Sequence, residues 1–96
     1  MKVIADVCIV PMGNGVSVSK EVKACVKLLK EANLNAQTHG YGTNLEGEWD
    51  EVFGVIKQCH EMLHASGTLR ISSTIRAGTR IDKDQTIQDK IDKVKE

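Results

Sequence analysis

At the centre of the chain lies Gly40-Tyr41-Gly42-Thr43-Asn44-Leu45-Glu46-Gly47-Glu48-Trp49, which holds the only Trp, the only Tyr and three of the eight glycines. A polar strand is expected to run into a turn here, followed by a short second strand and a helix that opens at Trp49. Glycine tolerates positive φ and lets another backbone or a ligand approach closely. Gly40, Gly42 and Gly47 therefore suit either a twisted hairpin or a small binding mouth, and the sequence leaves both interpretations open.

The residues before this hairpin predict a buried strand and an amphipathic helix. Residues 2–10 are largely apolar on both alternating faces, which is typical of a central strand, and Pro11 is expected to end it. Ser17 or Ser19 is expected to cap a helix that runs to about Ala32. The apolar positions of this helix follow the i, i+3, i+4, i+7 rule, at Val22, Cys25, Val26 and Leu29.

The remaining pattern predicts two further strands and a second helix. Residues 33–35 are expected to stop the first helix, and the strand over 36–42 is polar for its length, as sheet edges are. A helix follows over 49–66, with Gly67 in the left-handed position after its end. The strand over 68–77 alternates between two faces. One carries Leu69, Ile71, Ser73 and Ile75, and the other carries Arg70, Ser72, Thr74 and Arg76.

A terminal helix completes the predicted fold. Asp82 and Gln85 have the spacing of a capping box, and Ile87, Ile91 and Val94 form the apolar seam of this helix. The order of elements is that of the ferredoxin-like β-α-β-β-α-β sandwich, an α+β fold, here with an added C-terminal helix. We expect all 96 residues to form one domain.

Both crossover helices of a ferredoxin-like protein cover the same face of the sheet. The opposite face is therefore open to water, a partner sheet or a ligand. The side chains predicted on it include Asp6, His39, Tyr41, Arg70, Thr74 and Arg76. Arginines mixed with a carboxylate favour a paired polar layer over a hydrophobic or lipid-binding patch.

Composition excludes several classes of function. Lys plus Arg and Asp plus Glu each number 13, so the chain lacks the net positive charge that draws proteins to nucleic acid or anionic lipid. Cys8, Cys25 and Cys59 are too widely spaced for a disulfide framework or a thiolate metal site, and each is expected in the core. No apolar run approaches about 20 residues, so we expect no membrane span, no signal peptide and a cytoplasmic location. A chain of this size buries a modest core, which favours association with copies of itself.

One motif suggests a metal site. His60-Glu61-Met62-Leu63-His64 matches the zinc-binding His-Glu-x-x-His pattern, in which the Glu serves as a general base. His60 falls on the apolar stripe of the second helix, no histidine follows His64, and only the distant Asp82 and Asp84 remain as third ligands. A half-buried histidine beside the core is the simpler interpretation, so we expect no metal.

Other sites found on this fold find little support. RNA binding needs aromatic residues on the sheet, but Phe53 lies on a predicted helix and only Tyr41 is placed to stack on a base. The loop over 11–17 offers backbone amides ahead of a helix, which suit either a bound anion or a simple turn. It contains no cation, unlike the loop of an acylphosphatase-like enzyme. No Ser-His-Asp or Cys-His grouping indicates a nucleophile.

Several stretches together resemble a known family. They are Ala5-Asp6-Val7-Cys8, Val10-Pro11-Met12-Gly13, Ser17-Val18-Ser19, Thr43-x-x-Glu46-Gly47-x-Trp49-Asp50-x-Val52 and Arg76-Ala77-Gly78-Thr79-Arg80-Ile81-Asp82-Lys83. Over essentially its whole length the chain is similar to the small thiamine-binding proteins. The resemblance implies a ferredoxin-like fold, assembly through sheet faces into dimers or tetramers, and binding of thiamine or its hydroxymethylpyrimidine part. It implies no enzymatic activity and no cofactor.

The hairpin and the open sheet face contain residue types that suit the two parts of such a ligand. Thiamine joins an aminopyrimidine, which needs paired hydrogen-bond donors and acceptors, to a cationic thiazolium, which needs an aromatic face or a carboxylate. We expect Trp49 and Glu46 to interact with the cation, and Thr43 and Asn44 to hydrogen-bond the ligand. Arg76 or Asp6 is expected to orient its ring.

A second interpretation applies to the charged residues outside the hairpin. Asp6, Arg76, Arg80 and Asp82 suit pairing across a subunit interface as well as contact with a ligand. The sequence therefore predicts a cytoplasmic, non-catalytic homo-oligomer that binds a thiamine-like small molecule and neither nucleic acid nor membrane. The alternative is a structural or regulatory interaction protein without a working ligand site.

Overall fold

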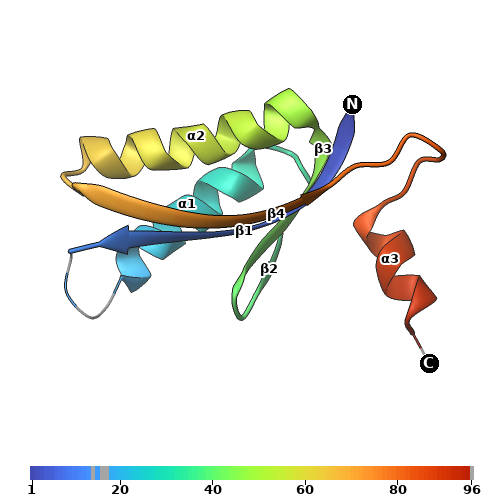
Figure 1. The fold of residues 1–96 in the computed structure, drawn as a ribbon. Coiled ribbons are helices and arrows are strands. Elements are labelled where there is room, and N and C mark those ends of the chain that lie inside the picture. The colour runs from blue at the N-terminus through green and yellow to red at the C-terminus, as the bar shows by residue number, and fades with distance from the viewer. Residues whose placement is uncertain (14, 16–17, 96) are drawn as a thin grey trace.

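A four-stranded antiparallel sheet carries two helices on one face, and a third helix lies beyond its end (Figure 1). The computed structural model describes residues 1–13, 15 and 18–95. The elements in chain order are β1 (Lys2–Met12), α1 (Ser19–Glu31), β2 (Gln37–His39), β3 (Gly42–Glu48), α2 (Trp49–Ala65), β4 (Arg70–Gly78) and α3 (Ile87–Lys93). The strand order β2-β3-β1-β4 confirms the ferredoxin-like arrangement with its additional C-terminal helix.

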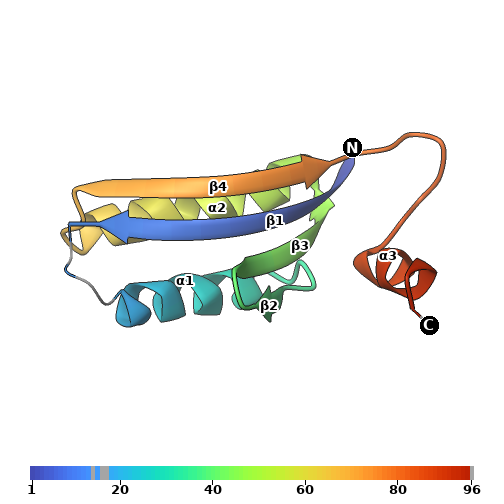
Figure 2. The same cartoon turned by 60° about the horizontal axis from the view of Figure 1, so that its bottom comes forward.

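β1 is the central strand, as its apolar residues on both faces predict. It pairs with β3 over Lys2 to Val7 and with β4 over Ile4 to Met12. Its odd-numbered residues are buried under α1 and α2, which lie on the same side of the sheet, and its even-numbered residues face the open side (Figures 1 and 2). The core consists mainly of Val3, Ala5, Val7, Ile9, Cys25, Leu29, Leu34, Leu45, Val52, Val55, Ile56, Cys59 and Leu63.

β1 continues through Pro11, so the predicted end of the strand at this residue is wrong. Pro11 is buried and lies opposite Ile71 of β4. β3 pairs with β1 only as far as Val7, which leaves the last part of β1 with a neighbour on one side only. A proline lacks an N–H group and is tolerated where a strand has a free side.

The cysteines divide between the core and the open face. Cys25 and Cys59 are buried, and the Cys59 thiol lies 3.9 Å from the backbone carbonyl oxygen of Cys25. Cys8 is half-buried on the open face, because it occupies an even-numbered position of β1. The expectation of a core position is therefore wrong for Cys8 alone.

Two further strands, β2 and β4, begin or end away from their predicted positions. β2 is shorter than the predicted strand over 36–42, since the chain turns at residues 40 and 41. β4 begins at Arg70, because the N–H of Thr68 donates instead to the carbonyl of Leu63 at the end of α2, at 3.0 Å. Leu69, which lies between the end of α2 and the start of β4, is 88% exposed and is not part of the sheet face that packs on the helices.

The helices also begin differently from the prediction. Val18 precedes α1 and makes no side-chain cap, so Ser19 is the first helical residue rather than the cap. The alternative cap, Ser17, lies outside the described residues, as does part of the loop that suits an anion. α3 has a capping box formed by Thr86 and Asp89, in which each side chain accepts the other residue's N–H at 3.0 Å.

α3 stands apart from the sandwich. Figures 1 and 2 show it beyond the end of the sheet, reached through the extended segment after β4. Asp82 and Gln85 lie in this segment, so they do not form the predicted capping box. Within the predicted seam, Ile87 is buried, whereas Ile91 is 41% and Val94 80% exposed. No helix among the described residues is long and apolar enough to cross a membrane.

The glycines of the hairpin differ in what surrounds them. A Cβ atom at Gly42 would lie 2.6 Å from the backbone oxygen of Val7, a contact that real Cβ atoms essentially never make. A Cβ atom at Gly40 would have no neighbour within 4 Å. Gly42 therefore permits the close approach of β3 to β1. This supports a structural role for Gly42 in the hairpin rather than a role in a binding mouth.

Replacing Gly42 with alanine should lower the free energy of unfolding by about 1 to 3 kcal/mol, because the new methyl group overpacks against the β1 backbone. Gly40→Ala is the matched control two residues away, and it should change the free energy of unfolding by less than about 0.5 kcal/mol. Urea unfolding followed by circular dichroism measures both variants. Equal stability of the two would contradict this account of the hairpin.

Candidate functional site

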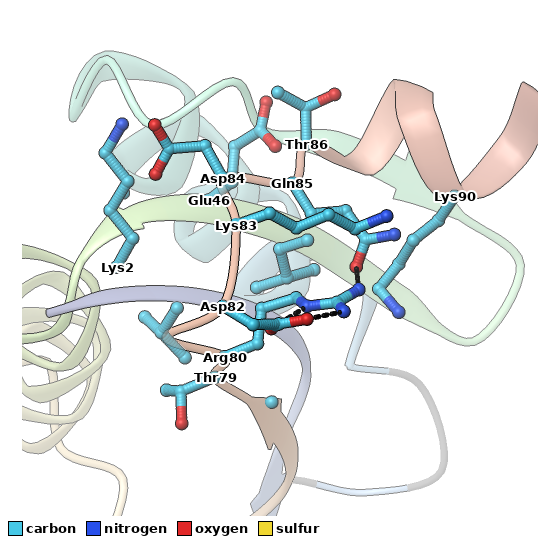
Figure 3. A pocket seen from close by; sticks show the side chains of 14 residues that line it. Lys2, Glu46, Thr79, Arg80, Asp82, Lys83, Asp84, Gln85, Thr86 and Lys90 are labelled. Carbon is cyan, nitrogen blue, oxygen red and sulfur yellow. Dashed lines mark hydrogen bonds and ion pairs between the residues drawn. The ribbon is translucent and has the colours of Figure 1, made fainter.

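A cavity lies where the start of β1, the end of β3 and the segment after β4 approach α3 (Figure 3). Its volume of about 620 Å³ is within the range of small-molecule sites, roughly 300 to 1,000 Å³. It is lined by residues 2–4 of β1, residues 46–47 of β3, residues 78–80 and 82–86, and Lys90 of α3. The cavity thus brings together both ends of the chain and the end of the hairpin.

The carboxylate of Glu46 joins three segments at the wall of this cavity. Its Oε1 accepts a hydrogen bond from Nδ2 of Asn35, and its Oε2 accepts one from the backbone N–H of Ile87, both at 2.7 Å. The backbone N–H of Glu46 donates to the carbonyl of Leu34 at 2.9 Å. A carboxylate is favourable beside the first turn of a helix, where N–H groups lack helical partners. Glu46 therefore ties β3 to the α1–β2 connection and to the start of α3.

An ion pair orders the segment between β4 and α3. Nε and Nη2 of Arg80 donate to the two carboxylate oxygens of Asp82 at 2.7 and 2.5 Å, and Nη1 reaches Oε1 of Gln85 at 3.4 Å. The hydrogen bonds from Arg80 lower the pKa of Asp82 to about 2, so the pair is charged at neutral pH. Arg80 and Asp82, which the sequence left between ligand and subunit contacts, therefore pair with each other within one chain.

The predicted ligand-binding residues are distributed over separate parts of the molecule. Glu46 lines the cavity. Asn44 and Arg76 lie on the open face of the sheet, where both are opposite Asp6 of β1 in the strand register. Thr43 is 3% exposed, and its Oγ1 lies 3.5 Å from Oγ1 of Thr38. Of these four residues, only Glu46 borders the cavity.

Trp49, the fifth predicted residue, is not among the residues that line the cavity. Its backbone N–H donates to the carbonyl of Met1 at 2.9 Å, which joins the start of α2 to the start of β1. Its ring packs on that of Phe53 with a centroid distance of 4.5 Å and an interplanar angle of 31°. The structure therefore does not bring the indole and the Glu46 carboxylate to the same cavity.

Sequence reasoning did not assign to a small-molecule ligand several charged residues that line the cavity, namely Lys2, Lys83, Asp84 and Lys90. Lys83 is the last residue of the stretch from Arg76 that carried the family resemblance, and this was the feature of the sequence that could have indicated a role for Lys83. Lys2 and Lys90 lie near opposite ends of the chain, and no local pattern relates them. Only the path of the chain after β4 brings them together.

The open face of the sheet carries a hydrogen-bonded pair formed by His39 and Asp6. Nε2 of His39 lies 2.6 Å from Oδ1 of Asp6, and Nδ1 of His39 accepts the backbone N–H of Tyr41 at 3.2 Å. Because Nδ1 accepts, Nε2 carries the proton that is donated to Asp6. Arg76 lies opposite Asp6 in the register, yet within the described part of the chain the two form no ion pair. The Asp6 carboxylate is thus satisfied by a histidine from the sheet edge.

Both histidines of the His-Glu-x-x-His motif have protein partners. Nε2 of His60 lies 2.6 Å from Oγ of Ser73 on β4, and Nδ1 of His64 lies 2.7 Å from the carbonyl oxygen of Thr68. His60 is half-buried between α2 and the sheet, as its place on the apolar stripe predicts. Across residues 1–13, 15 and 18–95, no three His, Cys, Asp or Glu side chains are grouped to hold a metal ion.

The sequence matches a family model and several curated relatives. The model for thiamine-binding proteins matches residues 5–95. A UPF0045 protein of Synechocystis sp. is 54% identical over 94 residues, which cover 98% of this chain and 78% of that protein. A UPF0045 protein of Eremothecium gossypii is 46% identical over 92 residues, which cover 95% of this chain and 88% of that protein.

Solved structures share the fold. A hypothetical protein of Methanocaldococcus jannaschii superposes with a TM-score of 0.88 at 36% identity, over 97% of this chain and 95% of that one. A Thermotoga maritima protein, named for a candidate role in thiamine biosynthesis or salvage, superposes with a TM-score of 0.84, over 99% of this chain and 100% of that one. At 17% identity, the second likeness concerns the fold alone.

We expect the purified protein to contain no stoichiometric zinc and its melting temperature to be unchanged by a chelator, because His60 and His64 are used in hydrogen bonds within the fold. Elemental analysis and thermal unfolding with and without chelator measure this. His60→Ala should lower the melting temperature in both conditions alike, through loss of the contact with Ser73. One zinc per chain would contradict the structural role of the motif.

Proposed function

The chain belongs to the thiamine-binding protein family, and we propose that it binds thiamine, or the hydroxymethylpyrimidine part of thiamine, in the cavity beside α3. The observation that carries the proposal is the mixed chemistry of the cavity wall. Apolar side chains lie next to carboxylate, amide and hydroxyl groups there, from Val3, Ile4, Glu46, Asp84, Gln85 and Thr86. Small-molecule sites combine apolar walls with a few polar groups in this way.

Each part of thiamine has a counterpart in this wall. The aminopyrimidine both donates and accepts hydrogen bonds, as the amide of Gln85 does. The thiazolium is a cation, and the carboxylates of Glu46 and Asp84 provide opposite charge. Trp49 lies outside the lining, so the attraction for the cation is assigned to carboxylates rather than to the indole.

The proposed role is binding without catalysis. The Ser–His contact found among the described residues, between Ser73 and His60, lies between β4 and α2 and involves no residue of the cavity wall. No carboxylate within the described chain hydrogen-bonds to His60, so the orienting third member of a nucleophilic triad is missing.

Three free cysteines suit a reducing compartment, and we propose a cytoplasmic location on that basis.

We also propose that the protein is a dimer or tetramer. Ile91 of α3 and Val94 directly after it are exposed, and in the preceding segment Ile81 is 98% accessible. On the open face of the sheet, Val10 and Met12 are exposed as well. A small domain gains stability by burying such side chains against a copy of itself, because each adds to a limited core.

Titration calorimetry with thiamine and with hydroxymethylpyrimidine tests the binding proposal. Both ligands should bind the wild type, and Glu46→Gln should bind thiamine about ten- to a hundredfold more weakly, because a charge-assisted contact is lost. The matched control is Glu48→Gln, two residues along the same strand and outside the cavity lining, which should bind like the wild type.

Two results would count against the proposal. Equal affinity of Glu46→Gln and the wild type would move the site away from the cavity. No heat with either ligand in the wild type would favour the alternative, an interaction protein without a working ligand site. Amide hydrogen exchange in α3 reports separately whether Glu46→Gln has released this helix, since Glu46 accepts the N–H of Ile87.

Ile91→Asp should shift the assembly toward smaller species, because a buried isoleucine contributes about 1.5 to 3 kcal/mol to an interface and a carboxylate does not. Ile91→Leu keeps the side chain apolar and should assemble like the wild type. Sedimentation velocity at micromolar concentration measures both. A monomeric wild type would rule out the proposed assembly.

A further inference from the structure

Cationic side chains gather at the α3 end of the cavity. Figure 3 shows the guanidinium of Arg80 and the ammonium groups of Lys83 and Lys90 on one side of the cavity, and the carboxylates of Glu46 and Asp84 on the other. Arg80 and Lys83 belong to the segment after β4, whereas Lys90 comes from α3. Lys2 lies on the side of these carboxylates and Asp82 lies beside Arg80, so the charges are mixed, with three of the four cations that line the cavity next to α3.

The positive charges are close enough to influence one another. The proximity of Lys93, and after it that of Arg80, lowers the pKa of Lys83. Like charges repel at short range, and holding them together costs free energy unless an anion lies between them. The sequence has no net charge, so this cluster is a local concentration of cations rather than part of a basic surface.

Nearby carboxylates are engaged elsewhere. Asp82 receives both of its hydrogen bonds from Arg80. Asp89 faces Lys83, but its carboxylate accepts the N–H of Thr86 in the capping box. Within residues 1–13, 15 and 18–95, the ammonium groups of Lys83 and Lys90 form no ion pair with any carboxylate. Both ammonium groups thus keep their hydrogen-bond donors for another anion.

We infer that the cavity takes a phosphorylated ligand, with a phosphate monoester held by Lys83 and Lys90 beside the guanidinium of Arg80. The inference rests on the proposed function, because it assigns the same cavity as the ligand site and adds a phosphate to the ligand. A phosphate monoester carries a charge of about −1.5 to −2 and three acceptor oxygens, which suits several donors arranged around one point. Ammonium and guanidinium groups are the usual protein partners of phosphate.

The opposite end of the cavity fits the rest of such a ligand. Thiamine monophosphate has a cationic ring at one place and a phosphate ester at another, so its charges are separated within one molecule. Glu46 and Asp84 meet the cation, and Lys83 and Lys90 meet the phosphate. An unphosphorylated ligand leaves the lysine ammonium groups without this anion, so the geometry favours the phosphate ester over the free alcohol.

Titration calorimetry of thiamine, thiamine monophosphate and inorganic pyrophosphate tests the inference. Thiamine monophosphate should bind the wild type about ten- to a hundredfold more tightly than thiamine, in line with charge-assisted hydrogen bonds to the phosphate. The double variant Lys83→Gln/Lys90→Gln should lose this preference and bind thiamine monophosphate no more tightly than it binds thiamine. The preference of the wild type should also shrink as ionic strength rises.

The matched control is Lys23→Gln/Lys27→Gln, which removes two exposed lysines from α1 and changes the net charge equally. This variant should keep the preference for the phosphate ester. Equal affinity of the wild type for thiamine and its monophosphate would overturn the inference and leave the proposed function intact. Persistence of the preference in the Lys83/Lys90 double variant would also overturn it.

The pyrophosphate arm separates the two proposals. If thiamine gives no heat but pyrophosphate binds the wild type and the α1 control and not the Lys83/Lys90 double variant, the anion site stands and the proposed function fails. If none of the three ligands binds the wild type, both proposals are overturned. Circular dichroism of each variant establishes that the compared proteins are folded.

Discussion

The carboxylate of Glu46 is the contact on which the C-terminal part of the structure depends. It accepts the N–H of Ile87 and the side-chain amide of Asn35 at once, so one residue of β3 positions both α3 and the connection after α1. Hydrogen bonds to a charged group contribute roughly 1.5 to 3 kcal/mol each. α3 lies beyond the end of the sheet, and its first residue, Ile87, has a buried side chain and donates its N–H to Glu46, so this bond positions the start of the helix. The cavity exists because of that placement, and a cationic ligand at Glu46 would be coupled to the position of α3.

The sheet separates two kinds of surface on one small domain. α1 and α2 cover one face, while the other carries the pair between His39 and Asp6 together with exposed apolar residues of β1. The cavity lies at the end of the sheet rather than on this face, and its walls come from within one chain. Assembly through the open face would therefore leave the residues that line the cavity in place. The open face and the cavity therefore use different residues of the same fold.

Charge in this protein is organised locally. The net charge of zero gives no long-range attraction to polyanions, yet three of the four cations that line the cavity lie together at its α3 end. In the His-Glu-x-x-His stretch, too, the sequence pattern and the three-dimensional surroundings indicate different roles. His60 and His64 have the spacing of zinc ligands, but their partners are Ser73 and the carbonyl of Thr68, which the turn after α2 brings beside the helix. The chemistry of this motif is therefore set by the groups that the fold places beside its histidines.

The sequence by itself determined the elements of the fold, because alternation and helical periodicity depend on residues close together in the chain. The central position of β1, the edge position of β2 and the apolar stripe of α2 all follow from such local patterns. Tertiary structure alone decided that β1 passes through Pro11, since that depends on where β3 stops pairing. It also decided the site. Glu46 meets Lys83 and Lys90 in one cavity, and Trp49 does not join them, because the segment after β4 crosses to the end of β3 before α3 begins. No periodicity encodes that crossing, which depends on a hydrogen bond between residues 41 positions apart.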